Sequence, residues 1–179
     1  MMTALSVTRE TERGTMESLL ATPAQPIEVM VGKLAPYVMV GLMQTAVILI
    51  MAAILFRVPM EGGWIALGLG VLMFITGSLA LGFLISTLAR TQLQAMQMSF
   101  FYMLPSILLS GFMFPFRGMP DWAQAIGAAI PVTHFLRVVR GALLKGEGLA
   151  TLWPSHAALG VFVCVVTALA MLRYRRTLD

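Results

Sequence analysis

The amino-acid sequence predicts an all-α fold: a polytopic membrane helix bundle with four transmembrane helices. The first reason is composition, because 59% of the 179 residues are hydrophobic and only 11% are charged, and the mean hydropathy is +0.87. Soluble globular domains carry about 25% charged residues. The second reason is that the charges are confined to short segments and leave four long stretches without any. A water-soluble domain is therefore close to excluded.

Each uncharged stretch is long enough to cross a lipid bilayer. The shortest of them has 23 residues, and about 20 apolar residues suffice for ~30 Å of hydrocarbon. A buried helix of a soluble protein would rarely need such a length without a charge. The predicted spans are residues 33–56, 64–88, 95–114 and 154–172.

Small residues inside the second span predict close helix packing. Ser78, Gly82 and Ser86 follow one another at intervals of four, and such a stripe lets another helix approach closely. In the third span Pro105 removes one backbone hydrogen bond, which predicts a kink. No ionisable residue lies in the middle of a span. This argues against a proton-relay transporter, because such proteins use carboxylates inside the membrane.

A charged segment precedes the first span. Residues 9–20 predict a helix outside the membrane, in which Arg9, Arg13 and Glu17 share one face because they lie four residues apart. Pro23 is expected to end this helix. One interpretation is a solvated amphipathic helix, and the other is a helix on which a soluble partner docks.

The segment between the third and fourth spans differs in kind. Residues 117–146 contain two helical stretches that are too short to span, separated by Pro131. The second stretch has an apolar face and a polar face. The apolar residues are Phe135, Leu136, Val139 and Leu143, and the polar residues are His134, Arg137 and Arg140. This pattern predicts a broken amphipathic hairpin that lies in the membrane interface or dips into the membrane as a re-entrant element.

The basic residues predict the orientation and the surroundings of the chain. Arg173, Arg175 and Arg176 directly follow the last span, and such a cluster is typical of the cytoplasmic side. With four spans, both termini are then cytoplasmic. Because the basic residues lie at the ends of spans, we expect them to contact membrane lipids. Nucleic acid is not an expected partner, because no basic stripe with interleaved aromatic residues occurs.

No set of residues predicts catalysis. His134 and His156 have no carboxylate or second ligand at metal-binding spacing, so each is expected to contact a headgroup or the backbone. Cys164 stands alone and is expected to be a small buried side chain. The phosphate-binding pattern GxxxxGK[ST] is absent. The chain is therefore not predicted to be an enzyme, to hold a cofactor or metal, or to be an ATPase itself.

Several motifs together resemble a known family. They are RETERGTMESLLATP from Arg9, GKLAPY from Gly32, LISTLARTQLQAMQ from Leu84, LPSILLSGFMFPF from Leu104, MPDW from Met119, IPVTHFLRVVRGALLKG from Ile130 and LWP from Leu152. With them the chain resembles the ABC-2 type transport permeases of bacterial inner membranes over essentially its entire length.

The resemblance implies a function and partners. Residues 1–32 would form a cytoplasmic coupling-helix segment that docks on a separate ATP-binding subunit, and residues 33–179 would form the transmembrane domain of an exporter. A second permease subunit, identical or different, is a further implied partner. The resemblance also implies that the hairpin is external. The implied docking residues are Glu10, Arg13, Gly14, Thr15 and Glu17.

The chain departs from the family pattern in one respect. Family members typically carry an additional span and an external domain upstream, so this sequence corresponds to the C-terminal part of such a permease. An alternative interpretation is therefore a truncated permease fragment or a membrane scaffold that transports nothing.

Overall fold

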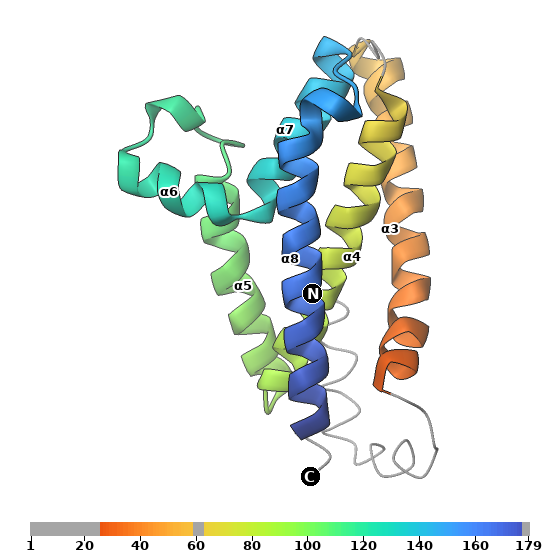
Figure 1. The fold of residues 1–179 in the computed structure, drawn as a ribbon, viewed down its shortest axis with the longest axis vertical. Coiled ribbons are helices and arrows are strands. Elements are labelled where there is room, and N and C mark those ends of the chain that lie inside the picture. The colour runs from red at the N-terminus through yellow and green to blue at the C-terminus, as the bar shows by residue number, and fades with distance from the viewer. Residues whose placement is uncertain (1–25, 59–62, 177–179) are drawn as a thin grey trace.

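The computed structural model describes residues 26–58 and 63–176, and all regular structure in them is helical. The predicted all-α fold is therefore confirmed. The helices, with the labels of Figure 1, are α3 (Pro26–Phe56), α4 (Trp64–Leu88), α5 (Gln92–Leu109), the 3-10 turn η1 (Phe116–Gly118), α6 (Asp121–Ala129), α7 (Pro131–Lys145) and α8 (Leu149–Arg176).

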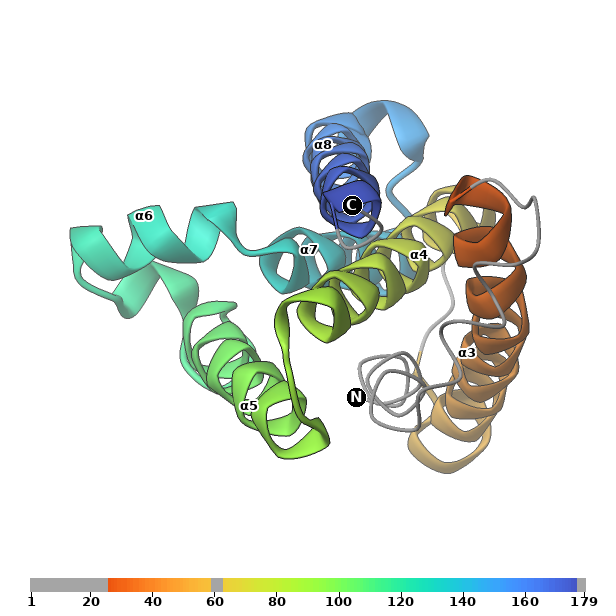
Figure 2. The ribbon, with the colours of Figure 1, turned by 90° about the horizontal axis from the view of Figure 1, so that it is seen from below.

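Helix α4 is at the centre of the bundle. It contacts α3, α5, α7 and α8, and Figure 2 shows α3 on one side of it with α5 and α6 on the other. The main core lies where α4, α7 and α8 meet, and it is built largely from small and branched residues. Its most buried members are Ala66, Val138, Ala142 and Leu159.

The outer faces of the helices are strongly apolar. On α3, for example, Ile54 and Phe56 have 70% and 79% of their surface exposed. In water such a surface would drive association, but lipid tails are as apolar as these side chains. The exposure therefore fits a bundle surrounded by a bilayer.

Three helical segments in the described residues are long and apolar enough to cross a membrane. They are Leu34–Phe56, Trp64–Leu88 and Leu149–Arg173, and the number rises to four if α6 and α7, which meet at 84°, are taken as one bent span. Helix α5, which holds most of the predicted third span, is not among them. Its first two turns carry Gln92, Gln94 and Gln97, so it is less apolar than these segments, although its 18 residues extend about 27 Å, close to the ~30 Å hydrocarbon core.

The third span is shorter than predicted because of a glycine. Helix α5 ends at Leu109, and Gly111 then adopts φ of +82°, a left-handed conformation that favours glycine. A Cβ atom at this position would lie 3.3 Å from the Cβ atom of Phe116. The chain therefore turns back on itself at residue 111, and residues 112–115 form a loop in place of the end of the helix.

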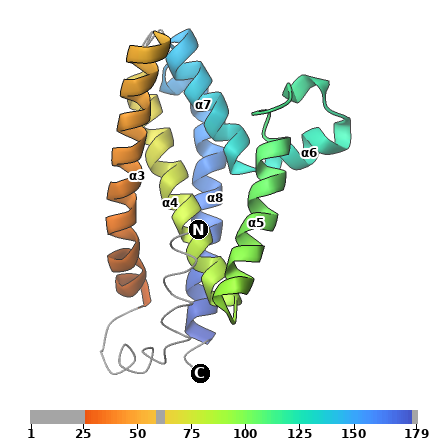
Figure 3. The ribbon, with the colours of Figure 1, turned by 180° about the vertical axis from the view of Figure 1, so that it is seen from behind.

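The path from the end of α4 to the start of α8 is made in two steps. Helix α5 rises along part of the bundle, α6 runs crosswise, and α7 continues to the end where α8 begins (Figures 1 and 3). The connections alternate between the two ends of the bundle, as the four-span prediction requires. The crossing assigned to the third span, however, is shared between α5 and α7.

Candidate functional site

The residues singled out from the sequence fall in three parts of the chain. The docking set of Glu10, Arg13, Gly14, Thr15 and Glu17 lies outside the described residues. The small-residue stripe lies on α4, and the remaining four residues lie on α7.

The small-residue stripe of α4 is divided between the interior and the surface. Gly82 and Ser86 are buried, whereas Ser78 is exposed. Gly82 and Ser86 thus lie inside this chain's own bundle. Only Ser78 remains on the outer surface of the described residues.

A different series of glycines brings the helices close together. Gly63, which directly precedes α4, and Gly70 and Gly77 within it lie seven residues apart and face α7, α8 or the segment between them. A Cβ atom on them would lie 2.5 Å from the Glu147 carbonyl oxygen, 2.7 Å from Val138 Cγ1 and 2.9 Å from the ring of Phe162, respectively. Sequence analysis missed this series, although a glycine interval of seven residues is a visible signal.

The bend between α6 and α7 is held by three residues. Pro131 occupies the first turn of α7, where its missing N–H costs nothing. Thr133 Oγ1 donates to the Gly127 carbonyl oxygen at 2.6 Å, and the His134 Nε2 atom donates to the Ala128 carbonyl oxygen at 2.8 Å. The last carbonyl groups of a helix lack partners within it. Here side chains from α7 bind those of α6, and the 84° bend follows.

Only one of the two ring nitrogen atoms of His134 has a hydrogen-bond partner among the described residues. With Nε2 donating to a carbonyl group, Nδ1 of the neutral ring carries a lone pair. The Nδ1 atom is buried and has no hydrogen-bond partner in the part of the chain that is described. His134 therefore contacts the backbone, which is one of the two contacts expected of it.

The two arginines of α7 return to the loop after α5. The guanidinium group of Arg137 lies 5.2 Å from the centre of the Phe116 ring, within the range of a cation–π interaction. Arg140 Nη2 donates to the Gly111 carbonyl oxygen at 3.2 Å. These contacts tie α7 to a loop more than twenty residues away in the sequence.

The interior face of α7 includes most of the predicted apolar face and extends beyond it. Leu143 is buried in the main core, and Phe135 and Val139 pack against it. The fully buried residues Val138 and Ala142, and the buried Gly141, were not assigned to that face. The reason is steric. Helix α4 approaches through Gly70, and only a small or short-branched residue fits between the two backbones.

Two further residues of α8 differ in their surroundings. His156 has 2% of its surface exposed. Its Nε2 atom lies 2.9 Å from the Ala66 carbonyl oxygen of α4, and its Nδ1 atom lies 2.9 Å from the Leu152 carbonyl oxygen. A neutral imidazole donates to only one acceptor, so one of the two carbonyl groups is bonded at a time. Cys164, which was expected to be buried, is exposed, because it lies on the outer face of α8.

No arrangement for catalysis or metal binding appears in the described residues. No group of three or more histidine, cysteine, aspartate or glutamate residues there could hold a metal ion. The features that remain are close helix contacts, a fixed bend and a loop held by arginines.

Comparison with known proteins identifies the family. Residues 1–144 match the model of a family described as ABC-2 type transporter. The chain is 31% identical over 175 residues to a probable multidrug ABC transporter permease, YbhR, of Escherichia coli (strain K12), and 33% identical over 179 residues to YbhS, which carries the same description in that organism. It is also 28% identical over 148 residues to ABC transporter G family member 20 of Dictyostelium discoideum.

These alignments cover most of this chain but only part of each relative. The alignments to YbhR and YbhS cover 98% and 99% of this chain and 48% of each relative. The alignment to the Dictyostelium protein covers 83% of this chain and 20% of that relative. The chain thus spans about half the length of the two bacterial permeases. No solved structure matches it significantly. The family match covers well over half of the chain, so the chain belongs to the ABC-2 type transporter family.

Proposed function

We propose that this chain is the membrane-spanning permease part of an ATP-driven exporter and forms part of its translocation pathway. The observation that carries the proposal is the family match over residues 1–144. Two bacterial relatives are described as probable multidrug permeases, so apolar drug-like compounds are the first cargo to test. ATP hydrolysis is assigned to a separate subunit, because the sequence lacks a GxxxxGK[ST] loop.

In this proposal residues 9–20 form the coupling helix that docks on the ATP-binding subunit. Closure of that subunit would push the helix and rock the bundle. The start of α3, the α4–α5 connection and the end of α8 lie at the same end of the bundle (Figure 1). That end carries Lys33, Arg90 and Arg173, which supports its assignment to the cytoplasm. The α6–α7 pair would then lie toward the external side.

A second permease subunit completes the proposed pathway. Support comes from α3, whose apolar side chains are exposed along most of the helix while few of its residues contact α4 and α8. A helix that packs so little against the other described helices offers surface to another permease subunit. The alternative of a scaffold that transports nothing is not favoured, because the relatives are described as transporters or permeases.

The coupling proposal is tested by copurification. The tagged full-length permease is extracted gently from its native membranes, and the proteins bound to it are identified by mass spectrometry. We expect an ATP-binding subunit to copurify. We expect Arg13→Glu and Glu17→Lys to reduce its recovery about tenfold, because each reversal opposes a charge pair at the docking surface, and close interfacial charge pairs couple by ~1.5 kcal/mol or more.

The matched control is Lys145→Glu, a charge reversal at the opposite end of the bundle. The Lys145 side chain is 70% exposed, and its Nζ atom lies 3.5 Å from a Glu147 carboxylate oxygen, an exposed pair that contributes little to stability. Recovery unchanged in all three variants would reject residues 9–20 as the docking element. A permease that purifies without any ATP-binding subunit would reject the exporter.

A further inference from the structure

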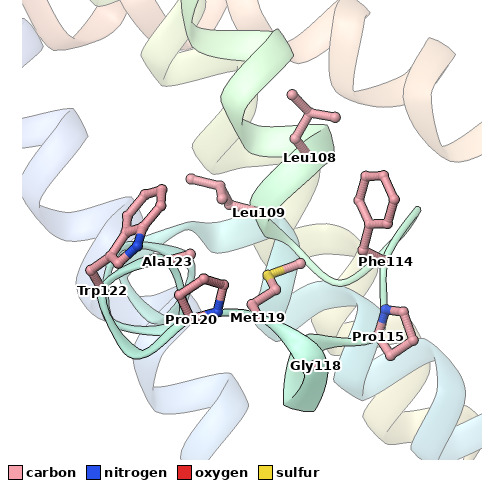
Figure 4. A pocket seen from close by; sticks show the side chains of 9 residues that line it. All are labelled: Leu108, Leu109, Phe114, Pro115, Gly118, Met119, Pro120, Trp122 and Ala123. Carbon is pink, nitrogen blue, oxygen red and sulfur yellow. The ribbon is translucent and has the colours of Figure 1, made fainter.

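An apolar pocket lies beside the arginine-bound loop. It has a volume of about 420 Å³, within the ~300–1,000 Å³ typical of ligand sites. The end of α5, the loop that follows it and the start of α6 form its walls (Figure 4). Its lining residues are Leu108, Leu109, Phe114, Pro115, Gly118, Met119, Pro120, Trp122 and Ala123.

Three arginines lie on or against the loop that forms part of the pocket wall. Arg117 is the central residue of η1, directly before the lining residue Gly118. Arg137 lies over the ring of Phe116, and Arg140 donates to Gly111. All three arginines are therefore attached to the loop that forms one wall. Between residues 110 and 145 the sequence has four lysine or arginine residues against a single acid, Asp121.

The surroundings of the pocket are those of a membrane interface. Phe112, Phe114 and Trp122 each expose more than half of their surface beside it, and exposed aromatic residues of this kind gather at the level of lipid headgroups. The crosswise direction of α6 (Figure 1) is also typical of a helix at an interface. An apolar pocket whose wall is formed by an arginine-bound loop matches a molecule with an apolar tail and an anionic head.

We propose that this pocket binds one anionic phospholipid. An acyl chain packs against Leu109, Met119 and Trp122, and the phosphate group accepts hydrogen bonds from the guanidinium groups of Arg117 and Arg137. Arginine suits this role because its planar donors match phosphate oxygens. A zwitterionic headgroup carries a positive charge beside its phosphate, and the arginines would repel that charge. The site should therefore prefer an anionic lipid over a zwitterionic one. The site does not depend on whether the chain exports anything.

The position of Trp122 provides a direct probe. In the full-length permease every tryptophan except Trp122 is replaced by phenylalanine, and the protein is reconstituted into phosphatidylcholine vesicles. Phosphatidylglycerol or phosphatidylcholine with brominated acyl chains is then added, and the quenching of Trp122 fluorescence is measured. Bromine quenches only at close range, so the signal reports an acyl chain in the pocket.

We expect brominated phosphatidylglycerol to quench at about a tenfold lower mole fraction than brominated phosphatidylcholine, since each basic residue near a membrane contributes about fivefold to the binding of anionic lipid. Arg117→Gln together with Arg137→Gln should remove this difference. Lys145→Gln, an exposed cation at the far end of α7, should retain it.

A second variant tests the pocket itself. Gly118 lines the pocket, and a Cβ atom there would meet no atom within 4 Å, so Gly118→Phe is chosen to place a bulky side chain at the pocket without a clash at the Cβ atom. We expect it to weaken quenching by both lipids while the arginines remain. Equal quenching by the two lipids would overturn the proposal. So would a Lys145→Gln control that loses the preference for phosphatidylglycerol as fully as the double arginine variant does. So would the absence of quenching by either lipid, because another segment or a second copy would then cover the pocket.

Discussion

At the scale of single residues, the core depends on glycines that leave room for neighbouring helices. At Gly70 the position of a Cβ atom lies 2.7 Å from Val138 Cγ1, closer than van der Waals contact allows. Val138 is fully buried and stiff at χ1 because it is β-branched. The pair therefore sets how closely α4 and α7 approach.

We expect Gly70→Ala to lower the free energy of unfolding by about 1–3 kcal/mol, because overpacking forces side chains and backbone to shift. Thermal unfolding of the purified protein in detergent would measure this. Gly68→Ala is the control on the same helix, since its Cβ atom would meet nothing within 4 Å, and it should be neutral or slightly stabilising. Adding Val138→Ala to Gly70→Ala should restore part of the loss. Equal effects at positions 68 and 70 would contradict this account.

At the scale of elements, the α6–α7 pair owes its shape to bonds between side chain and backbone. The proline alone would end α6 without fixing the direction of α7. The direction is set by Thr133 and His134, whose side chains reach carbonyl groups six residues earlier in the chain. The start of α6, which this bend joins to α7, forms part of the wall of the pocket proposed to bind lipid.

We expect Thr133→Val to loosen this bend without unfolding the bundle. Valine keeps the shape of threonine but loses the hydrogen bond to Gly127, which costs about 1 kcal/mol, so backbone amides of α6 should exchange hydrogen about fivefold faster. Hydrogen exchange followed by mass spectrometry measures this. Thr45→Val is the matched control, because Thr45 Oγ1 bonds only to Gly41 within its own helix. Unchanged exchange in α6 would show that the bend does not depend on Thr133.

At the scale of the whole molecule, the arrangement predicts that the two ends of the bundle face different compartments. Arg57 follows α3 at one end, and Arg90 follows α4 at the other. Helix α4, which connects these two ends, is long and apolar enough to cross the membrane. In the orientation proposed from the positive-inside rule, Arg90 faces the cytoplasm.

Cysteine labelling tests this orientation. In a background with Cys164→Ala, we expect Arg57→Cys to react with a membrane-impermeant maleimide in intact spheroplasts. Arg90→Cys should react only after permeabilisation, because its thiol faces the cytoplasm. Both residues are exposed in the structure, so access to the thiol does not limit either reaction. The reverse pattern would invert the proposed orientation, and labelling of both from outside would contradict a crossing by α4.

The sequence by itself determined the class of the molecule. Uncharged runs of at least 23 residues match the thickness of a bilayer, and a backbone in lipid must satisfy its hydrogen bonds internally, so an all-helical bundle follows from local information. The same holds for the break at Pro131, which acts on its immediate neighbours. The family could also be recognised, because its motifs are continuous segments of the chain.

Only the tertiary structure decided which residues meet. The end of α5 at Leu109 depends on the conformation of Gly111, and the interior face of α7 depends on Gly70 of α4. Within the arginine-bound loop, Phe116 and Arg137 lie twenty-one residues apart in the sequence and touch in space. Periodicity cannot reveal such pairs, because it records the faces of one helix and not the neighbour opposite. The lining of the pocket is local, because all of it lies within residues 108–123, but its shape depends on the turn at Gly111, which periodicity does not reveal.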